Sequence, residues 1–171
     1  IGYAHEITIR RAFTRIGNPM ELAALKTQAL VETWWDVALY QYAVRQLEFA
    51  KAEIDKIAAT LPGYLDFACN PRLHVSLAYH ACGLYDTVTS VEDALAFVEY
   101  VFDHFADAVS FGKTDRRKAK AKVCAITAFD SHPRREMRRL LKAVIRSIWF
   151  DPTYLSNLGL LKLFWQVPKT R

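Results

Sequence analysis

The sequence has few glycines, few cysteines and no long uncharged apolar run. Only six of its 171 residues are glycine, and it contains no Gly-rich phosphate loop, no Gly-x-Ser-x-Gly turn and no His-Glu-x-x-His pair. Charged residues such as Glu32, Asp36, Arg45 and Glu48 interrupt the richest apolar stretch, so no segment reaches the roughly 18 residues of a membrane-spanning helix. We therefore expect neither a membrane insertion nor any catalytic residue, cofactor or metal site.

The three cysteines, Cys69, Cys82 and Cys124, are odd in number and far apart. This spacing gives neither a disulfide framework nor a Cys-x-x-Cys pair, and it favours a reducing compartment. Cys82 and Cys124 each lie among alanines and aromatic residues, where cysteine is typical of a small buried hydrophobic side chain. We expect packed thiols rather than reactive ones.

Charge is distributed unevenly along the chain. Residues 1–70 carry seven Lys or Arg against eight Asp or Glu, residues 71–112 carry one against six, and residues 113–171 carry fifteen against four. An acidic middle followed by a basic end predicts an electrostatic dipole, which can attract nucleic acid, an acidic protein surface or lipid. The alternative is an ordinary pair of solvated faces, one basic and one acidic.

The remaining sequence predicts an all-α protein. Asn18-Pro19 is typical of a helix start, and apolar residues recur at three- and four-residue steps from Val31 to Leu61, which indicates an amphipathic helix or a close-packed pair of helices. Pro62-Gly63 should end this region. Glu6 to Arg10 alternates in polarity and predicts a short extended arm.

Further along, start signals recur before apolar helical patterns. Asn70-Pro71 precedes a helix ending near Gly83, Thr89 to Glu92 resembles a capping box, Thr114-Asp115 begins another hairpin with a pause at 131–133, and Asp151-Pro152 begins a last helix. Successive helical hairpins predict an irregular α-solenoid in a single helical-repeat domain. Its expected parts are an N-terminal arm at 1–17, a degenerate hairpin at 18–69, hairpins at 70–112 and 113–150, and a terminal helix and tail at 151–171.

Two stretches carry a resemblance to a known family. Tyr79-His80-Ala81-Cys82-Gly83 followed by Glu92-Asp93-Ala94-Leu95-Ala96-Phe97-Val98, and Phe150 to Tyr154 opening a further unit, resemble pentatricopeptide repeats, over roughly residues 70–166. The resemblance implies stacked helical hairpins that bind single-stranded RNA, one base per repeat. The chain departs from the family pattern because Leu73 and Leu155 occupy the expected base-reading positions, and leucine offers a base no hydrogen bond.

In size and plan the chain is also similar to the small pentatricopeptide-like accessory subunits of mitochondrial ATP synthase in trypanosomes and other euglenozoans. This resemblance implies a noncatalytic mitochondrial subunit on the matrix side, bound to the alpha subunit of the F1 part. A start at Ile1 without methionine suits a trimmed chain or the removal of a targeting peptide. The alternatives are an organellar RNA-binding factor and a helical subunit of a nucleoprotein effector complex.

Candidate partner-binding residues fall into a basic and an aromatic group. A basic stripe with helical spacing should hold like charges close together, which acidic groups of a partner would offset; simple solubility is the alternative. Large aromatic residues contribute strongly to interfaces, although most should fill the core. The candidates are Arg135, Arg138, Arg139, Lys142 and Arg146 in the stripe, and Trp35, Phe150 and Trp165 among the aromatic residues.

One cluster has the residue types of a metal or acid/base site. The spacing of Asp103, His104 and Asp107 would place a carboxylate and an imidazole on one helical face, as metal ligands or an acid/base pair. Neighbouring phenylalanines mark that helix as a packing element, so we expect a solvated acidic edge there.

Overall fold

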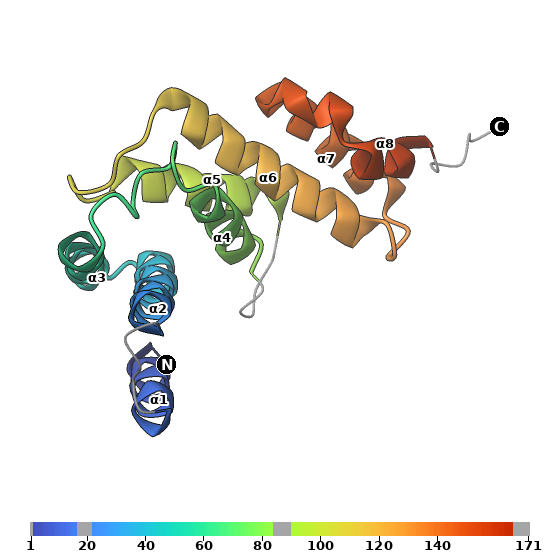
Figure 1. The fold of residues 1–171 in the computed structure, drawn as a ribbon. Coiled ribbons are helices and arrows are strands. Elements are labelled where there is room, and N and C mark those ends of the chain that lie inside the picture. Colours follow the sequence, from blue (N-terminus) through green and yellow to red (C-terminus); the bar gives the residue numbers. More distant parts are fainter. Residues whose placement is uncertain (1, 17–21, 84–89, 166–171) are drawn as a thin grey trace. The chain divides into compact units, whose positions relative to one another are not determined.

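The structure, a computed structural model, describes residues 2–16, 22–83 and 90–165. Within these ranges the chain is all-α, as the apolar spacing predicts (Figure 1). The chain divides into two units, Ile1–Asn70 with His104–Ser110, and Pro71–Asp103 with Phe111–Arg171. The predicted hairpin boundary at Asn70-Pro71 thus coincides with a boundary between units, and the stacking of all hairpins into one solenoid stays a prediction.

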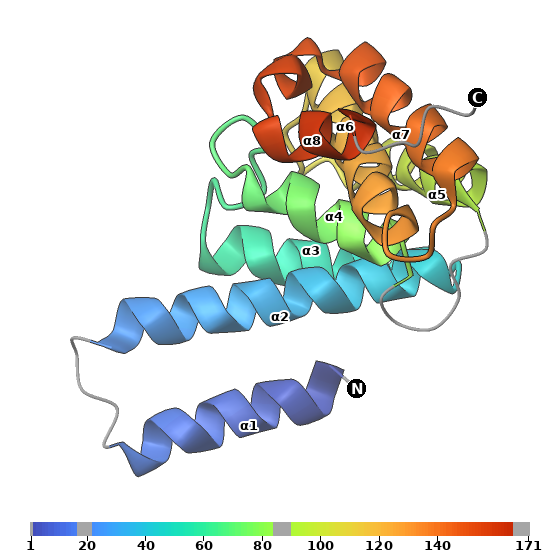
Figure 2. The same cartoon turned by 90° about the vertical axis from the view of Figure 1, so that its right-hand side faces the viewer.

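The first unit begins with a helix where an extended arm was expected. Helix α1 (Gly2–Arg15) lies beside α2 (Ala23–Ala43) (Figure 2). Two contacts explain the difference: Glu6 accepts a hydrogen bond from the indole nitrogen of Trp34 at 2.9 Å, and it forms an ion pair with Arg10 one turn later. The short alternation at residues 6–10 is therefore overridden by a tertiary contact and a helical ion pair. The predicted helix start at Asn18-Pro19 lies outside the described residues.

The second and third helices form the close-packed pair that the 31–61 pattern allowed. Helix α3 (Leu47–Thr60) packs against α2 after a tight turn in which Arg45 has a φ of 64°. Both helices bury apolar side chains, including Leu39, Ile54 and Ile57. Gly63, with a φ of 85°, follows the end of α3, where glycine adopts the left-handed region without strain.

Residues 104–110 complete the first unit from a distant part of the chain. The amide of Phe67 donates to the carbonyl of Ser110 at 3.1 Å, and the Tyr42 hydroxyl donates to the carbonyl of His104 at 3.1 Å. The Phe105 ring packs against three aromatic rings of this unit, with centroid distances of 5.6 to 6.0 Å. These rings belong to Trp35, Tyr42 and Phe67.

The second unit is built around one long central helix. Helix α6 (Lys113–Ser131) packs against α4 (Arg72–Ala81), α5 (Val91–Asp103), α7 (Met137–Phe150) and α8 (Leu158–Trp165) (Figures 1 and 2). The helix ends agree with the predicted stops: α4 is followed by Gly83, whose φ is 69°, and α6 ends at Ser131. The hairpins α4/α5 and α6/α7 therefore follow the expected order.

A small-residue contact lets α8 pack closely on the α6/α7 hairpin. Alanines 125, 128 and 143 lie in one core cluster with larger side chains from α7 and α8, which include Leu140, Val144, Leu160 and Leu163. Alanine leaves room for helix backbones to approach, and the leucines fill the space between them. Leu160 is fully buried as a result.

The single helix expected after Asp151-Pro152 is two pieces. Asp151 caps a short 3₁₀ helix, η2 (Pro152–Ser156), by accepting a hydrogen bond from the Thr153 amide at 3.0 Å. Asn157 then interrupts the helix, and its side-chain oxygen accepts from the Leu160 amide at 3.1 Å to begin α8. Two successive capping side chains thus replace one continuous helix.

Candidate interaction surface

The acidic middle of the sequence pairs with its basic end inside the second unit. Arg116 forms ion pairs with Glu99 at 2.8 Å and with Asp103 at 2.7 Å, and Lys120 also pairs with Glu99. Arg117 donates to the carbonyl oxygens of Trp149 and Phe150 at the end of α7, which stabilises unpaired carbonyls there. Several of the acidic and basic side chains that predict an electrostatic dipole therefore form ion pairs with each other inside this unit.

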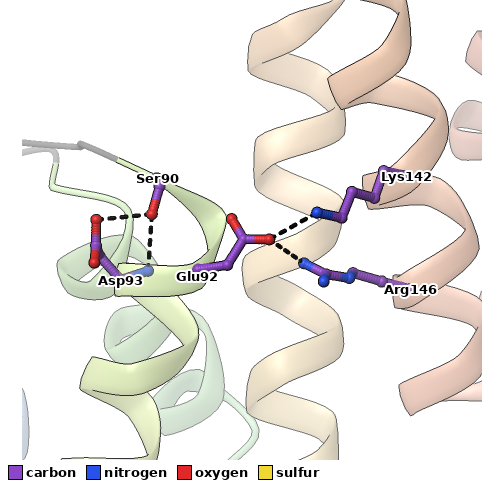
Figure 3. Close-up of polar contacts among 5 residues, drawn as sticks. All are labelled: Ser90, Glu92, Asp93, Lys142 and Arg146. Atoms are coloured by element: carbon purple, nitrogen blue, oxygen red, sulfur yellow. Dashed lines mark hydrogen bonds and ion pairs between the residues drawn. The ribbon is translucent and has the colours of Figure 1, made fainter.

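Glu92 joins the start of α5 to the basic stripe on α7. One of its carboxylate oxygens accepts from Lys142 at 2.8 Å and from Arg146 at 2.9 Å (Figure 3). Hydrogen bonds from these two cations lower the pKa of Glu92 to about 2. The carboxylate therefore keeps its charge at pH values where an ordinary glutamate is protonated.

The cap of α5 is shifted by one residue from the predicted Thr89–Glu92 box. Ser90 is the capping residue, because its hydroxyl oxygen accepts from the Asp93 amide at 3.0 Å and its hydroxyl donates to the Asp93 carboxylate at 2.7 Å (Figure 3). Thr89 lies outside the described residues. With Asp93 serving the cap, the Glu92 side chain is available to reach α7.

The basic stripe is partly neutralised by this chain itself. Lys142 and Arg146 pair with Glu92, and Arg139 pairs with Glu136 at 3.1 Å. The Arg138 side chain is exposed and forms no ion pair or hydrogen bond with another described residue. Arg135, also exposed, lies in the turn before α7 with a φ of 59°. Repulsion along the stripe therefore does not by itself require an acidic partner.

Four side chains of the stripe line a groove between α5 and α7. The groove has a volume of about 310 Å³. Its α5 wall is the first turn of that helix, and its α7 wall carries the cations. The lining residues are Ser90, Val91, Glu92, Arg138, Arg139, Lys142, Ala143 and Arg146.

The aromatic candidates occupy three different environments. Trp35 is only 2% exposed in the core of the first unit, so its burial removes it from the candidate partner-binding side chains. Phe150 is half-buried, with the Lys120 ammonium 5.4 Å from its ring centroid. Trp165 is 79% exposed and Trp149 is 70% exposed. Trp149 was not among the predicted partner-binding residues, although its position next to Phe150 in the sequence was a signal that could have identified it.

Large apolar side chains are exposed near the end of the chain. Leu158 and Trp165 lie seven residues apart on α8 and so share one helix face, and Leu158 is 81% exposed. The opposite face of α8 carries the buried Leu160 and Leu163. Leu155 is a further exposed apolar side chain in η2, just before α8. Exposed leucines and tryptophans are typical of binding sites when they lie close together.

Outside this surface, the residues with the chemistry of a metal or acid/base site have structural roles. Helix α5 ends at Asp103, so His104 and Asp107 do not share its helical face as expected. Within the described ranges, no group of three or more His, Cys, Asp or Glu side chains is placed to hold a metal ion. His74 and Asp115 are both buried, with 3.2 Å between Nε2 and Oδ1, and burial lowers the pKa of His74. This pair joins α4 to α6.

The helices of the described part of the chain include none with the length and apolarity needed to cross a bilayer. Comparison with protein-family models, with curated proteins and with solved structures gives no match.

Proposed function

We propose that this chain is a noncatalytic accessory subunit that docks on a larger protein assembly through the outer face of α8. The most specific form of the proposal, taken from the resemblance in size and plan, is an accessory subunit of mitochondrial ATP synthase bound to the alpha subunit of F1. In that setting the chain is a peripheral protein on the matrix side of the inner membrane and makes no membrane insertion of its own.

The observation that carries the proposal is the two-faced character of α8. One face is fixed in the core by Leu160 and Leu163, while Leu158 and Trp165 on the other face are 81% and 79% exposed. A helix that presents an exposed leucine and tryptophan supplies the kind of anchor that fills a pocket or a helix groove on a protein partner. Lys162 lies between them on the same face and suits a polar rim.

Two observations favour a protein partner over RNA. At the predicted base-reading positions, Leu73 is fully buried and Leu155 is an exposed apolar side chain, and neither can hydrogen-bond a base. Many of the basic residues are also held by Glu92, Glu99 and Glu136, so fewer of them remain for backbone phosphates.

Copurification tests the proposal directly. We expect the full-length tagged chain, purified from mitochondria under native conditions, to elute with F1 subunits in stoichiometric amounts and without nucleic acid. A double variant, Leu158→Ala with Trp165→Ala, should lose this association. Phe49→Ala is the matched control, because Phe49 is 65% exposed on α3 of the first unit, and it should leave the association intact.

Each outcome bears on a separate part of the proposal. Elution with a different complex would overturn the ATP synthase assignment and keep the docking role, whereas elution as a free monomer would overturn docking itself. Submicromolar binding of single-stranded RNA with a steep salt dependence, weakened by Arg138→Ala and Arg139→Ala, would replace the proposal with the RNA-binding alternative.

A further inference from the structure

We propose that the groove between α5 and α7 is a binding site for a polyphosphate group. The proposal does not depend on the docking function of α8, because the groove is formed by different side chains. Its basis is the concentration of positive charge in a small concave volume, together with the identity and pairing of the cations that line it.

The groove gathers four cationic side chains against one carboxylate. Arg138, Arg139, Lys142 and Arg146 come from successive turns of α7, and Glu92 is the single acidic residue among the described lining residues. The formal charge of these described residues is therefore +3. Three of the four cations are arginines, whose planar guanidinium groups each offer several donors to phosphate oxygens.

The cations differ in how far they are already committed. The Arg138 side chain has no ion pair or hydrogen bond among the described residues, and the Arg139 side chain is held there only by Glu136 at 3.1 Å. Lys142 and Arg146 share one oxygen of Glu92. A ligand entering the groove thus meets one uncommitted guanidinium and three cations whose present partners are partly exposed carboxylates.

The lining favours a phosphate-rich anion over other anionic ligands. Among the described residues, the lining contains no aromatic ring on which a nucleobase could stack, and its apolar side chains are Val91 and Ala143. A ligand with one carboxylate would neutralise only one of the three surplus positive charges of the lining. A diphosphate carries enough negative charge to neutralise all three. The volume of about 310 Å³ also accommodates a chain of phosphates.

Glu92 acts in this arrangement as an internal competitor. Its carboxylate already occupies the donors of Lys142 and Arg146 (Figure 3). Removing its charge should free these donors for a bound anion. Loss of the Glu92 contacts with Lys142 and Arg146 should therefore strengthen ligand binding, whereas a merely structural role for Glu92 predicts no such gain.

Calorimetric titration of the full chain with inorganic pyrophosphate tests the site. We expect saturable binding at one site per chain, with amide shifts in the NMR spectrum confined to Ser90, Glu92 and residues 138–146 of α7. The double variant Arg138→Ala with Arg139→Ala should weaken binding about tenfold or more. Glu92→Gln should strengthen it by about threefold.

Arg134→Ala provides the matched control. Arg134 belongs to the same unit and pairs with Asp130, with a 61% exposed side chain, but it does not line the groove. It should change the affinity for pyrophosphate by less than about twofold. Each variant should keep the circular dichroism spectrum of the parent chain, since all the changed side chains are at least partly exposed.

Three results would overturn the site. These are no saturable binding of pyrophosphate, equal losses from Arg134→Ala and from the double variant, or weaker binding by Glu92→Gln. Titrations with tripolyphosphate and with ATP then distinguish the source of the phosphates. Equal affinities indicate that the phosphate chain alone is recognised, whereas a clear preference for ATP indicates a nucleotide.

Discussion

Leu160 and Leu158 lie on the same short helix and should separate folding from docking. Leu160 is fully buried in the cluster where α8 packs on α6 and α7, whereas Leu158 is 81% exposed. Replacing either residue by alanine removes the same three carbon groups. We expect Leu160→Ala to destabilise the second unit and Leu158→Ala to leave its stability unchanged.

The size of the effect follows from burial. At about 0.8 kcal/mol for each buried carbon group, the lost transfer free energy of Leu160 is about 2.4 kcal/mol. The cavity left among closely packed alanines and leucines adds to this, so we expect a loss of about 3 kcal/mol in the free energy of unfolding. Leu158→Ala should change it by less than about 0.5 kcal/mol.

Amide hydrogen exchange is the appropriate assay, because a chain with two units need not unfold in a single two-state step. The free energies of exchange should be read from the most protected amides of α6 and α7. Equal, small changes in the two variants would refute the packing of α8 on this hairpin. Copurification should show the opposite order of effects. Leu158→Ala should weaken the association with the partner although the chain remains folded.

Three further measurements test the ion pairs, the buried histidine and the thiols. NMR titration should show the Glu92 carboxyl ionised down to about pH 2, and Lys142→Ala should raise its pKa toward the ordinary 4.5; an unchanged pKa would contradict the pairing. Because burial lowers the pKa of His74 below 6.5, the unfolded chain binds this proton more tightly, so the second unit should be most stable above pH 6.5 and lose stability as the pH falls through that value. Denaturant unfolding of the parent and of His74→Gln at about pH 7.5 and 5.5 checks this, since the variant should lose that part of the slope. A maleimide should modify the exposed Cys69 well before Cys124, which is buried and whose pKa is raised to about 12; preferential labelling of Cys124 would contradict its burial.

Local signals predicted most of the helix order. Pro71 before α4, Gly83 after it and Asp151-Pro152 before η2 all act through the backbone of adjacent residues, so the sequence alone carries the information. The same signals cannot distinguish one helix from two when a second capping residue such as Asn157 lies within the run.

Contacts between distant residues could not be predicted in this way. Helix α1 is held against α2 by a hydrogen bond from the Trp34 indole to the Glu6 carboxylate, and these residues are 28 positions apart in the sequence. Glu92 reaches Lys142 and Arg146, which follow it by 50 and 54 residues. Segment charges show that acidic and basic stretches exist, but only the packing of α5 and α7 on α6 brings Glu92 within reach of the α7 cations.

The contribution of residues 104–110 to the first unit has a consequence for the order of synthesis. The Tyr42 hydroxyl and the Trp35 ring find their partners at His104 and Phe105, which leave the ribosome after α4 and α5. The N-terminal helices therefore cannot complete their core when residue 70 emerges. A fragment that ends at Asn70 should be incompletely packed, and the first unit of the nascent chain should mature only after residue 110 has been added.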